Sequence, residues 1–183
     1  MSFFETIFTE TNKRNLRFLV IGGLAINFYG YSRETGDMDL LIHRDNRDQW
    51  LKLFSSLGYG VYREGQGFLQ LSPPEQSAWP VDFMLVRENT FQPMYSASRE
   101  VNLYGVETRI PSLEHLLMLK LHALKNARLN RFLKDFLDVE NLIRINKLDL
   151  KSENMKQLFA KYGTQELYEK ISTSLGNDGS TQR

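Results

Sequence analysis

Two closely spaced aspartates at the start of an apolar run constrain this chain more than any other feature. Asp37 and Asp39 are followed by Leu40-Leu41-Ile42, which predicts a buried β-strand. Because alternate side chains share one face of a strand, both carboxylates point the same way, with Cα atoms roughly 7 Å apart. Two carboxylates held at that separation repel each other unless a cation lies between them. The pair therefore favours a divalent metal site, and a solvated strand end is the alternative.

A second apolar run precedes these acids. Residues 18–21 predict a strand, Gly22-Gly23 a turn and residues 24–29 a short helix. A third acid, Asp82, lies near the start of another predicted strand at residues 81–86. Glu75 is the alternative third acid, but the two prolines before it predict a loop rather than a strand.

The character of the chain changes at Pro111. Before it, helices and strands alternate, with helices predicted at residues 3–12 and 46–54 and further strands at 60–63, 68–71, 101–104 and 106–110. After it, helices are predicted at residues 113–124, 130–145, 152–162 and 165–174. We therefore expect a mixed α/β core at residues 1–111, a helical region at 112–175 packed on that core, and a disordered polar tail at 176–183.

Composition excludes several classes of protein. The chain has 183 residues with a formal net charge of +1, which gives no global indication of nucleic-acid or membrane binding. It has no cysteine, so disulfides, thiolate chemistry and Cys-ligated zinc are excluded. The first residues do not predict a signal peptide, and no apolar run approaches the roughly 18 residues that span a bilayer. We expect a soluble, cytoplasmic protein without a membrane partner.

The order of these features resembles the polymerase-β-type nucleotidyltransferase superfamily. The resemblance rests on Gly22-Gly23-x-Ala25, Arg33-x-Thr35-x-Asp37-x-Asp39 and the later Asp82. Within the superfamily, the chain is similar to antibiotic nucleotidyltransferases and to the nucleotidyltransferase-like toxins of abortive-infection systems. The match covers residues 16–86 well, and the helices around residues 120–138 are more similar to the toxin-like group. The resemblance implies a nucleotidyltransferase-like mixed sheet flanked by helices.

The resemblance also implies the chemistry of the acids. Asp37, Asp39 and Asp82 would ligate two Mg²⁺ ions, with Mn²⁺ as the alternative ion, and Asp82 could also accept the proton of an attacking hydroxyl. Two such ions about 3.5–4 Å apart clamp the attacking and departing oxygens of a phosphoryl transfer. Magnesium prefers oxygen ligands and keeps several waters, so three carboxylates and substrate phosphates suffice.

Nucleotide binding is assigned by the same resemblance to four further residues. Gly22 and Gly23 would let the backbone approach the triphosphate, although many members of the superfamily have serine where this chain has Gly23. Arg33 could pair with phosphate oxygens or form a structural ion pair. Lys120 could reach the phosphates or extend from a leucine-rich helix into solvent.

Other charged groups have structural explanations that compete with functional ones. Asp135 and Asp138 are expected to pair with Lys134 or Arg131 on their own helix. Five cations lie close together in the sequence: Lys120, Lys125, Arg128, Arg131 and Lys134. They either form a solvated helix face or line a cleft that attracts phosphates or the end of an RNA. The three histidines are expected to be structural.

Three functions are compatible with these features. The first is transfer of a nucleoside monophosphate from an NTP to a hydroxyl of a small molecule, a protein or a tRNA end, with release of pyrophosphate. The second is a toxin–antitoxin-type subunit that acts through a cognate protein partner with little turnover. The third is a regulator that binds NTP without chemistry. The complete acidic trio favours the enzyme, because a protein that only binds nucleotide has little need of Asp82.

Overall fold

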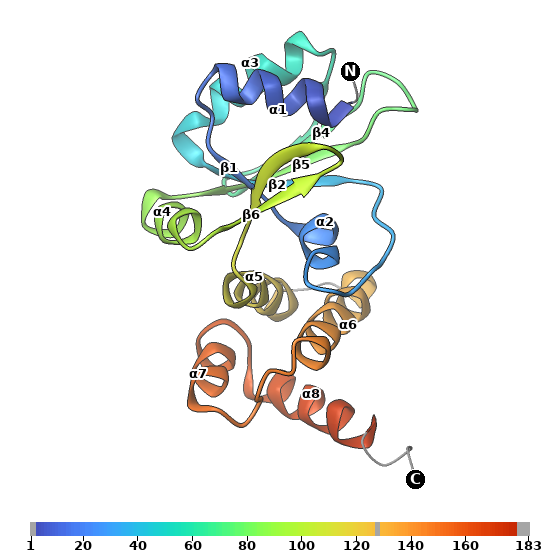
Figure 1. The fold of residues 1–183 in the computed structure, drawn as a ribbon, viewed down its shortest axis with the longest axis vertical. Helices are drawn as coiled ribbons and strands as arrows, with labels where there is room; N and C mark the ends of the chain where they lie inside the picture. The colour runs from blue at the N-terminus through green and yellow to red at the C-terminus, as the bar shows by residue number, and fades with distance from the viewer. Residues whose placement is uncertain (1–2, 127–128, 179–183) are drawn as a thin grey trace. The chain divides into compact units, whose positions relative to one another are not determined.

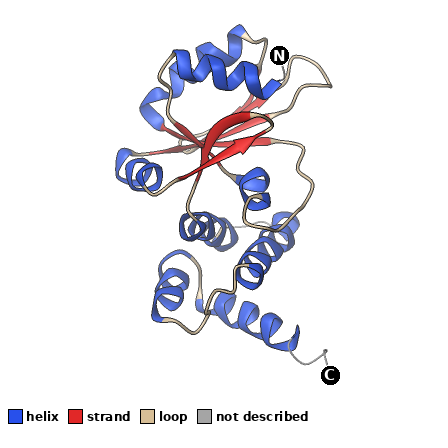
Figure 2. Ribbon diagram, in the orientation of Figure 1, coloured by secondary structure: helices blue, strands red, loops and turns tan. Residues whose placement is uncertain are grey.

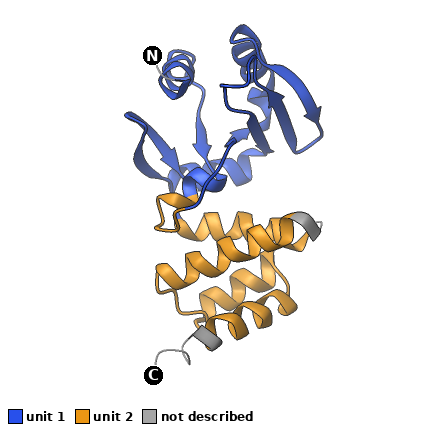
Figure 3. Ribbon diagram, turned by 90° about the vertical axis from the view of Figure 1, so that its right-hand side faces the viewer, with its two compact units in different colours: residues 1–25, 33–112 blue, residues 26–32, 113–183 orange. Residues whose placement is uncertain are grey.

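The computed structural model describes residues 3–126 and 129–178, which fall into two compact units. Unit 1 comprises residues 1–25 and 33–112, and unit 2 comprises residues 26–32 and 113–183 (Figure 3). The sequence did not predict that the short segment 26–32 groups with the later helices. Within the part of the chain that the structure describes, no helix is both long and apolar enough to cross a lipid bilayer.

Unit 1 is built on a mixed sheet of five strands (Figure 2). In spatial order these are β1 (Phe18–Val20), β2 (Met38–His43), β5 (Val81–Val86), β4 (Phe68–Ser72) and β3 (Gly60–Glu64). The central pair, β2 and β5, is parallel, and every other neighbouring pair is antiparallel. The parallel pairing places two strands side by side that are far apart in the sequence.

Two helices cover one face of this sheet. Helices α1 (Phe3–Lys13) and α3 (Arg47–Ser56) lie together on one face (Figure 1). The indole of Trp50 on α3 packs against Phe18 and Phe83, with ring centroids 5.5 and 5.3 Å away. Trp50 is fully buried, so the aromatic stripe predicted from the sequence is core. Residues that alternate with this apolar set along β2, β5 and β4 therefore point to the opposite face.

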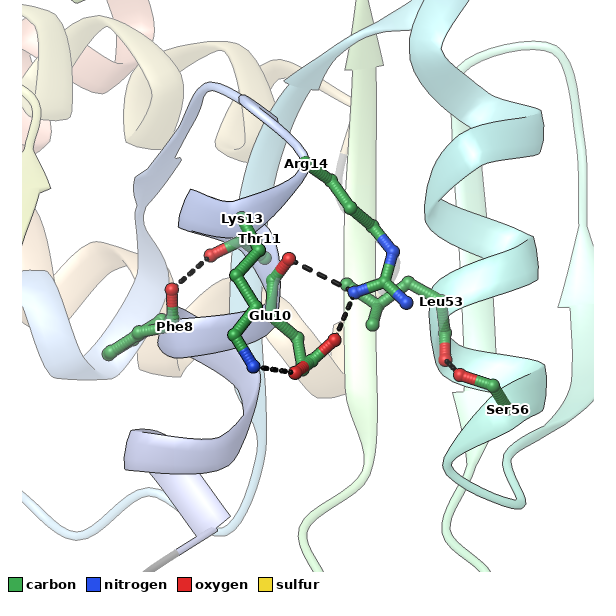
Figure 4. A network of polar contacts seen from close by, with 7 residues as sticks. All are labelled: Phe8, Glu10, Thr11, Lys13, Arg14, Leu53 and Ser56. Atoms are coloured by element: carbon green, nitrogen blue, oxygen red, sulfur yellow. Dashed lines mark hydrogen bonds and ion pairs between the residues drawn. The ribbon is translucent and has the colours of Figure 1, made fainter.

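Polar contacts fix the end of α1 in unit 1 (Figure 4). The carboxylate of Glu10 accepts hydrogen bonds from Lys13 and Arg14, and the Thr11 hydroxyl donates to the carbonyl of Phe8 at 2.9 Å. The hydrogen bonds from Lys13 and then Arg14 lower the pKa of Glu10. Glu10 is partly exposed, so these bonds order the surface of the helix end rather than its core.

The remaining elements of unit 1 are short. They are α2 (Gly22–Asn27), which continues into the segment assigned to unit 2, the 3₁₀ turn η1 (Arg44–Asn46), α4 (Glu88–Ser96) and the hairpin of β6 (Arg99–Leu103) and β7 (Val106–Ile110). Helix α4 was not predicted from the sequence, because Pro93 lies inside it. Its buried residues Phe91 and Met94 nevertheless follow helical spacing.

Unit 2 is helical. Its helices are α5 (Leu113–Lys125), α6 (Leu129–Ile145), α7 (Glu153–Tyr162) and α8 (Gln165–Asp178). The segment 26–32 joins this unit through the side-chain amide of Asn146, which donates to the carbonyls of Tyr29 at 3.0 Å and Leu142 at 2.9 Å. Ser152 caps α7, because its hydroxyl accepts a hydrogen bond from the backbone N–H of Met155.

The mixed α/β fold predicted from the sequence is confirmed. The strands around the acids and the four later helices lie where the apolar patterns indicated. Helix α8 ends at Asp178, three residues into the polar tail that the sequence predicted at 176–183. Residues 179–183 lie outside the described part of the chain.

Candidate active site

Strand register places two of the three acids side by side. Asp39 on β2 and Asp82 on β5 are direct partners in the parallel ladder. Their neighbours Met38, Leu40 and Val81 are fully buried, whereas both aspartates are half-buried. Because side chains alternate along a strand, the two carboxylates leave the core on the same face of the sheet.

The third acid joins them from outside the ladder. Asp37 directly precedes β2 and is two residues from Asp39, so it projects to the same side. One carboxylate oxygen from each of Asp37, Asp39 and Asp82 lies within 4.8 Å of the other two. Among the described residues, this is the one group of three or more acidic or histidine side chains with such spacing. The structure therefore brings together all three acids singled out in the sequence.

The two glycines make room for this arrangement. A Cβ on Gly22 would lie 1.8 Å from Oδ2 of Asp39, and the φ of Gly22 is +63°. A Cβ on Gly23 would lie 2.7 Å from Cβ of Thr35. Any side chain at either position would therefore displace the residues of the acidic motif, so the Gly-Gly pair is required by packing inside unit 1.

Two neutral side chains orient the acids. The Thr35 hydroxyl donates to Oδ1 of Asp37 at 2.7 Å, and the Gln70 side-chain amide donates to Oδ2 of Asp82 at 2.7 Å. Hydrogen bonds from neutral donors fix a carboxylate without cancelling its charge. The sequence motif included Thr35, but no local pattern identified Gln70, which reaches Asp82 only because β4 pairs with β5.

Arg33 lies beside the second glycine. A Cβ on Gly23 would be 3.1 Å from one terminal nitrogen of Arg33, and that nitrogen donates to the carbonyl of Glu34 at 3.2 Å. The guanidinium is thus close to the acidic motif in unit 1. Its assignment to phosphate binding stays a prediction.

Lys120 does not extend into solvent, which was one of the two interpretations of this residue from the sequence. It is buried in unit 2, and its ammonium contacts carboxylate oxygens of Asp135 and Asp138 at 2.7 Å each. Both aspartates are also buried, and they pair with this lysine on α5. Lys134 and Arg131, the partners expected on the same helix as the aspartates, are exposed. A nucleotide-binding role for Lys120 remains a prediction, and its contacts are those of a buried ion pair.

Two other charged residues singled out in the sequence have partners of their own in unit 1. Glu75 is exposed in the loop before β5, where it accepts a hydrogen bond from Ser77, and it does not belong to the cluster. The imidazole of His43 lies 3.4 Å from the carboxylate of Glu88. Of the five clustered cations, Lys125, Arg131 and Lys134 are exposed, and Arg128 lies outside the described residues.

The donor set of the site suits a hard divalent cation. All three side chains offer carboxylate oxygen, the ligand that Mg²⁺ and Mn²⁺ prefer, and one oxygen of each lies within 4.8 Å of the other two. Two of the three are already oriented by hydrogen bonds from neutral groups. The residues present therefore fit a magnesium or manganese ion.

A mixed sheet with an acidic trio on one face, behind a Gly-Gly turn, defines the class of polymerase-β-type nucleotidyltransferases. The chain belongs to the family described as "Uncharacterised nucleotidyltransferase", whose model matches residues 3–173. Comparison with curated proteins gives no significant match.

Solved structures share this fold at low sequence identity. The solution structure of the antibiotic-resistance factor ANT(2'')-Ia has a TM-score of 0.65 and 17% identity, over 95% of each chain. An antigenic nucleotidyltransferase-like protein from Paracoccidioides brasiliensis has a TM-score of 0.56 and 18% identity, over 93% of this chain and 89% of that one. The lincomycin-bound lincosamide adenylyltransferase LnuA has a TM-score of 0.57 and 16% identity, over 78% of this chain and 95% of its own.

Proposed function

We propose that this chain transfers a nucleoside monophosphate from an NTP to a hydroxyl acceptor at the site formed by Asp37, Asp39 and Asp82. The observation that carries the proposal is the convergence of the three carboxylates, with their oxygens within 4.8 Å, in a chain of a nucleotidyltransferase family. The related folds include adenylyltransferases that act on antibiotics, which supports nucleotidyl transfer as the reaction class.

In the proposed reaction, the acceptor oxygen bonds to the α-phosphorus of the NTP. The bond from that phosphorus to the oxygen bridging to the β-phosphate breaks, and pyrophosphate leaves with the electron pair. The proton of the attacking hydroxyl passes to the carboxylate of Asp82 or to solvent. Bound Mg²⁺ would neutralise charge that develops on the phosphoryl oxygens.

The chain's own residues prepare this step. Asp37, Asp39 and Asp82 would hold the cations, Thr35 and Gln70 fix two of these carboxylates, and Gly22 leaves the space that Asp39 fills. Arg33 lies beside Gly23 and would pair with phosphate oxygens, for which a guanidinium is well shaped. The backbone of Gly22 and Gly23 is assigned to the triphosphate by the family resemblance.

The test is incubation with each of the four labelled NTPs and Mg²⁺, with tRNA, candidate antibiotics or no addition. Wild-type protein is expected to release pyrophosphate and to label one acceptor class. Folded Asp39→Asn and Asp82→Asn proteins are expected to lose this activity by at least about 100-fold, because each lacks a metal ligand. An Asp39→Asn protein that retains the wild-type rate would disprove the assignment.

The same experiment separates nucleotidyl transfer from the two non-catalytic functions. A subunit that works through a partner would co-purify with one protein in fixed ratio and turn over none of the NTPs. A regulator would bind NTP in a Mg²⁺-dependent way, measured by calorimetry, and yield no product by mass spectrometry.

A further inference from the structure

Asp39 and Asp82 are the first two members of a row of directly paired residues that crosses the sheet of unit 1 and continues on two more strands. Gln70 on β4 is the direct partner of Asp82, and Arg63 on β3 is the direct partner of Gln70. Directly opposed residues share one face of a sheet, and neighbouring strands lie about 4.7–4.9 Å apart. The ladder of β3 is irregular between Val61 and Arg63, but the pairing of Arg63 with Gln70 continues regularly at Glu64. Gln70 and Arg63 therefore extend the acidic site sideways along its own face.

Arg63 brings positive charge to this end of the row. Its side chain is exposed, and among the described residues no carboxylate lies within ion-pair distance of its guanidinium. Arg47, which is close to the same hairpin, is in contrast paired with Glu64 and Asp48. The charge of Arg63 is therefore not balanced by a carboxylate of the described residues.

An aromatic ring lies under this guanidinium. Phe68 is two residues from Gln70 on β4, so both project to the same face, and the ring is 37% exposed. The guanidinium carbon of Arg63 is 5.3 Å from the centroid of the ring. Exposed aromatic rings and the planes of arginine side chains are the surfaces on which proteins stack nucleobases.

We propose that Arg63 and Phe68 form a nucleotide-binding shelf beside the acids, in which Arg63 contacts a phosphate and the ring and guanidinium plane contact a base. This proposal rests on the proposed function, because the shelf lies in the same row as Asp39 and Asp82. The nucleotide has two sources, the donor NTP or the hydroxyl-bearing end of a nucleic-acid acceptor. An acceptor rich in ammonium groups would instead meet Arg63 as a like charge.

The experiment measures the affinity of two probes in Mg²⁺ buffer. One is the α,β-methylene analogue of each NTP, which cannot release pyrophosphate. The other is a fluorescent single-stranded RNA of about ten nucleotides with a free 3′-hydroxyl, a length typical of single-strand sites. Arg63→Gln is expected to weaken at least one probe about tenfold through loss of a charge-assisted contact, and to make its binding less dependent on salt. Weaker binding of the analogue assigns the shelf to the donor NTP, and weaker binding of the RNA assigns it to the acceptor.

Two further variants are measured with the same probes: Phe68→Leu tests the ring, and Arg87→Gln is the control. Phe68→Leu keeps apolar bulk without the ring, and it is expected to weaken the same probe as Arg63→Gln. Arg87 is an exposed arginine of unit 1 that follows β5 at the end away from Asp82, so Arg87→Gln is expected to bind both probes like wild type.

Wild-type affinity of Arg63→Gln for both probes would overturn the proposal. If wild-type protein still transferred label in that case, the shelf alone would be disproved. A wild-type protein that neither binds Mg²⁺ nor transfers label would disprove the proposed function together with the shelf.

Discussion

The carboxylate of Asp39 occupies the space that a side chain on Gly22 would need. The gap between Oδ2 and a Cβ built on this glycine is 1.8 Å, far inside van der Waals contact. The positive φ of Gly22 adds a second constraint, because residues with a Cβ rarely adopt that conformation. One glycine thus supports both the turn after β1 and the position of a catalytic candidate.

Gly22→Ala is therefore expected to damage stability and activity together. We expect a loss of at least about 2 kcal/mol in the free energy of unfolding, from backbone strain and the displaced carboxylate. Urea unfolding followed by circular dichroism checks this value. Gly67→Ala is the matched control, because a Cβ there would meet no atom within 4 Å. Equal stability of the two variants would show that Asp39 moves aside without cost.

Gln70→Leu is expected to weaken metal binding while the fold persists. The change keeps the bulk of the side chain but removes the 2.7 Å hydrogen bond to Asp82. Loss of such a supporting contact typically costs 10–100-fold in metal affinity, so we expect a loss of about tenfold. Electron paramagnetic resonance of bound Mn²⁺ measures this affinity in the absence of any reaction.

The control for this change is Gln92→Leu on α4, which removes the hydrogen bond that Gln92 accepts from Arg17 and the one that it donates to Ser96. It is expected to bind Mn²⁺ like wild type. High Mg²⁺ is expected to restore the activity of Gln70→Leu. If Mn²⁺ affinity in Gln70→Leu equalled that of wild type, Gln70 would have no role in positioning Asp82.

Lys120→Met tests whether the lysine is structural. Removal of the ammonium leaves the buried Asp135 and Asp138 without this partner, and breaking a buried ion pair typically costs about 3–5 kcal/mol. Chemical denaturation measures the loss, with Lys125→Met on the exposed side of the same helix as control. Adding Asp135→Asn to Lys120→Met is expected to recover part of it. A stable Lys120→Met protein with weakened NTP binding would instead support the nucleotide-binding prediction.

The stability of the protein is expected to fall below neutral pH through His115. Burial lowers the pKa of this imidazole, and the nearby Glu114 opposes the shift only in part. The unfolded chain therefore takes up the proton at a higher pH than the folded chain. The contribution of His115 to stability is complete above the ordinary histidine pKa, and it is lost as the pH falls through the lower pKa of the folded state. Thermal unfolding from pH 7.5 to pH 5 measures this dependence.

His115→Gln is expected to flatten that profile relative to wild type. His122→Gln removes an exposed histidine of the same helix and provides the comparison. Parallel profiles for His115→Gln and wild type would assign the pH dependence to other groups.

The sequence singled out the three acids by two routes: local alternation for Asp37 and Asp39, and family resemblance for Asp82, whose place beside Asp39 depends on the pairing of β2 with β5. Alternation along β2 placed Asp37 and Asp39 on one face, and an apolar run with Asp82 near its start marked β5. Gln70 could not be found in this way, because its contact depends on which strands pair and in what register. The partners of Lys120 likewise lie on the next helix, beyond the reach of spacing rules within one helix.

The register of the β3–β4 hairpin has a consequence for how this chain can vary. Exposed loops usually tolerate added residues, and residues 65–67 are exposed. One residue inserted within β4 before Gln70 would reverse the alternation, turning that amide toward α3 and away from Asp82. Length changes confined to the connecting loop leave the ladder intact, whereas those absorbed by the strand do not. Indels among natural homologues should therefore avoid β4 more strictly than its exposure alone would suggest.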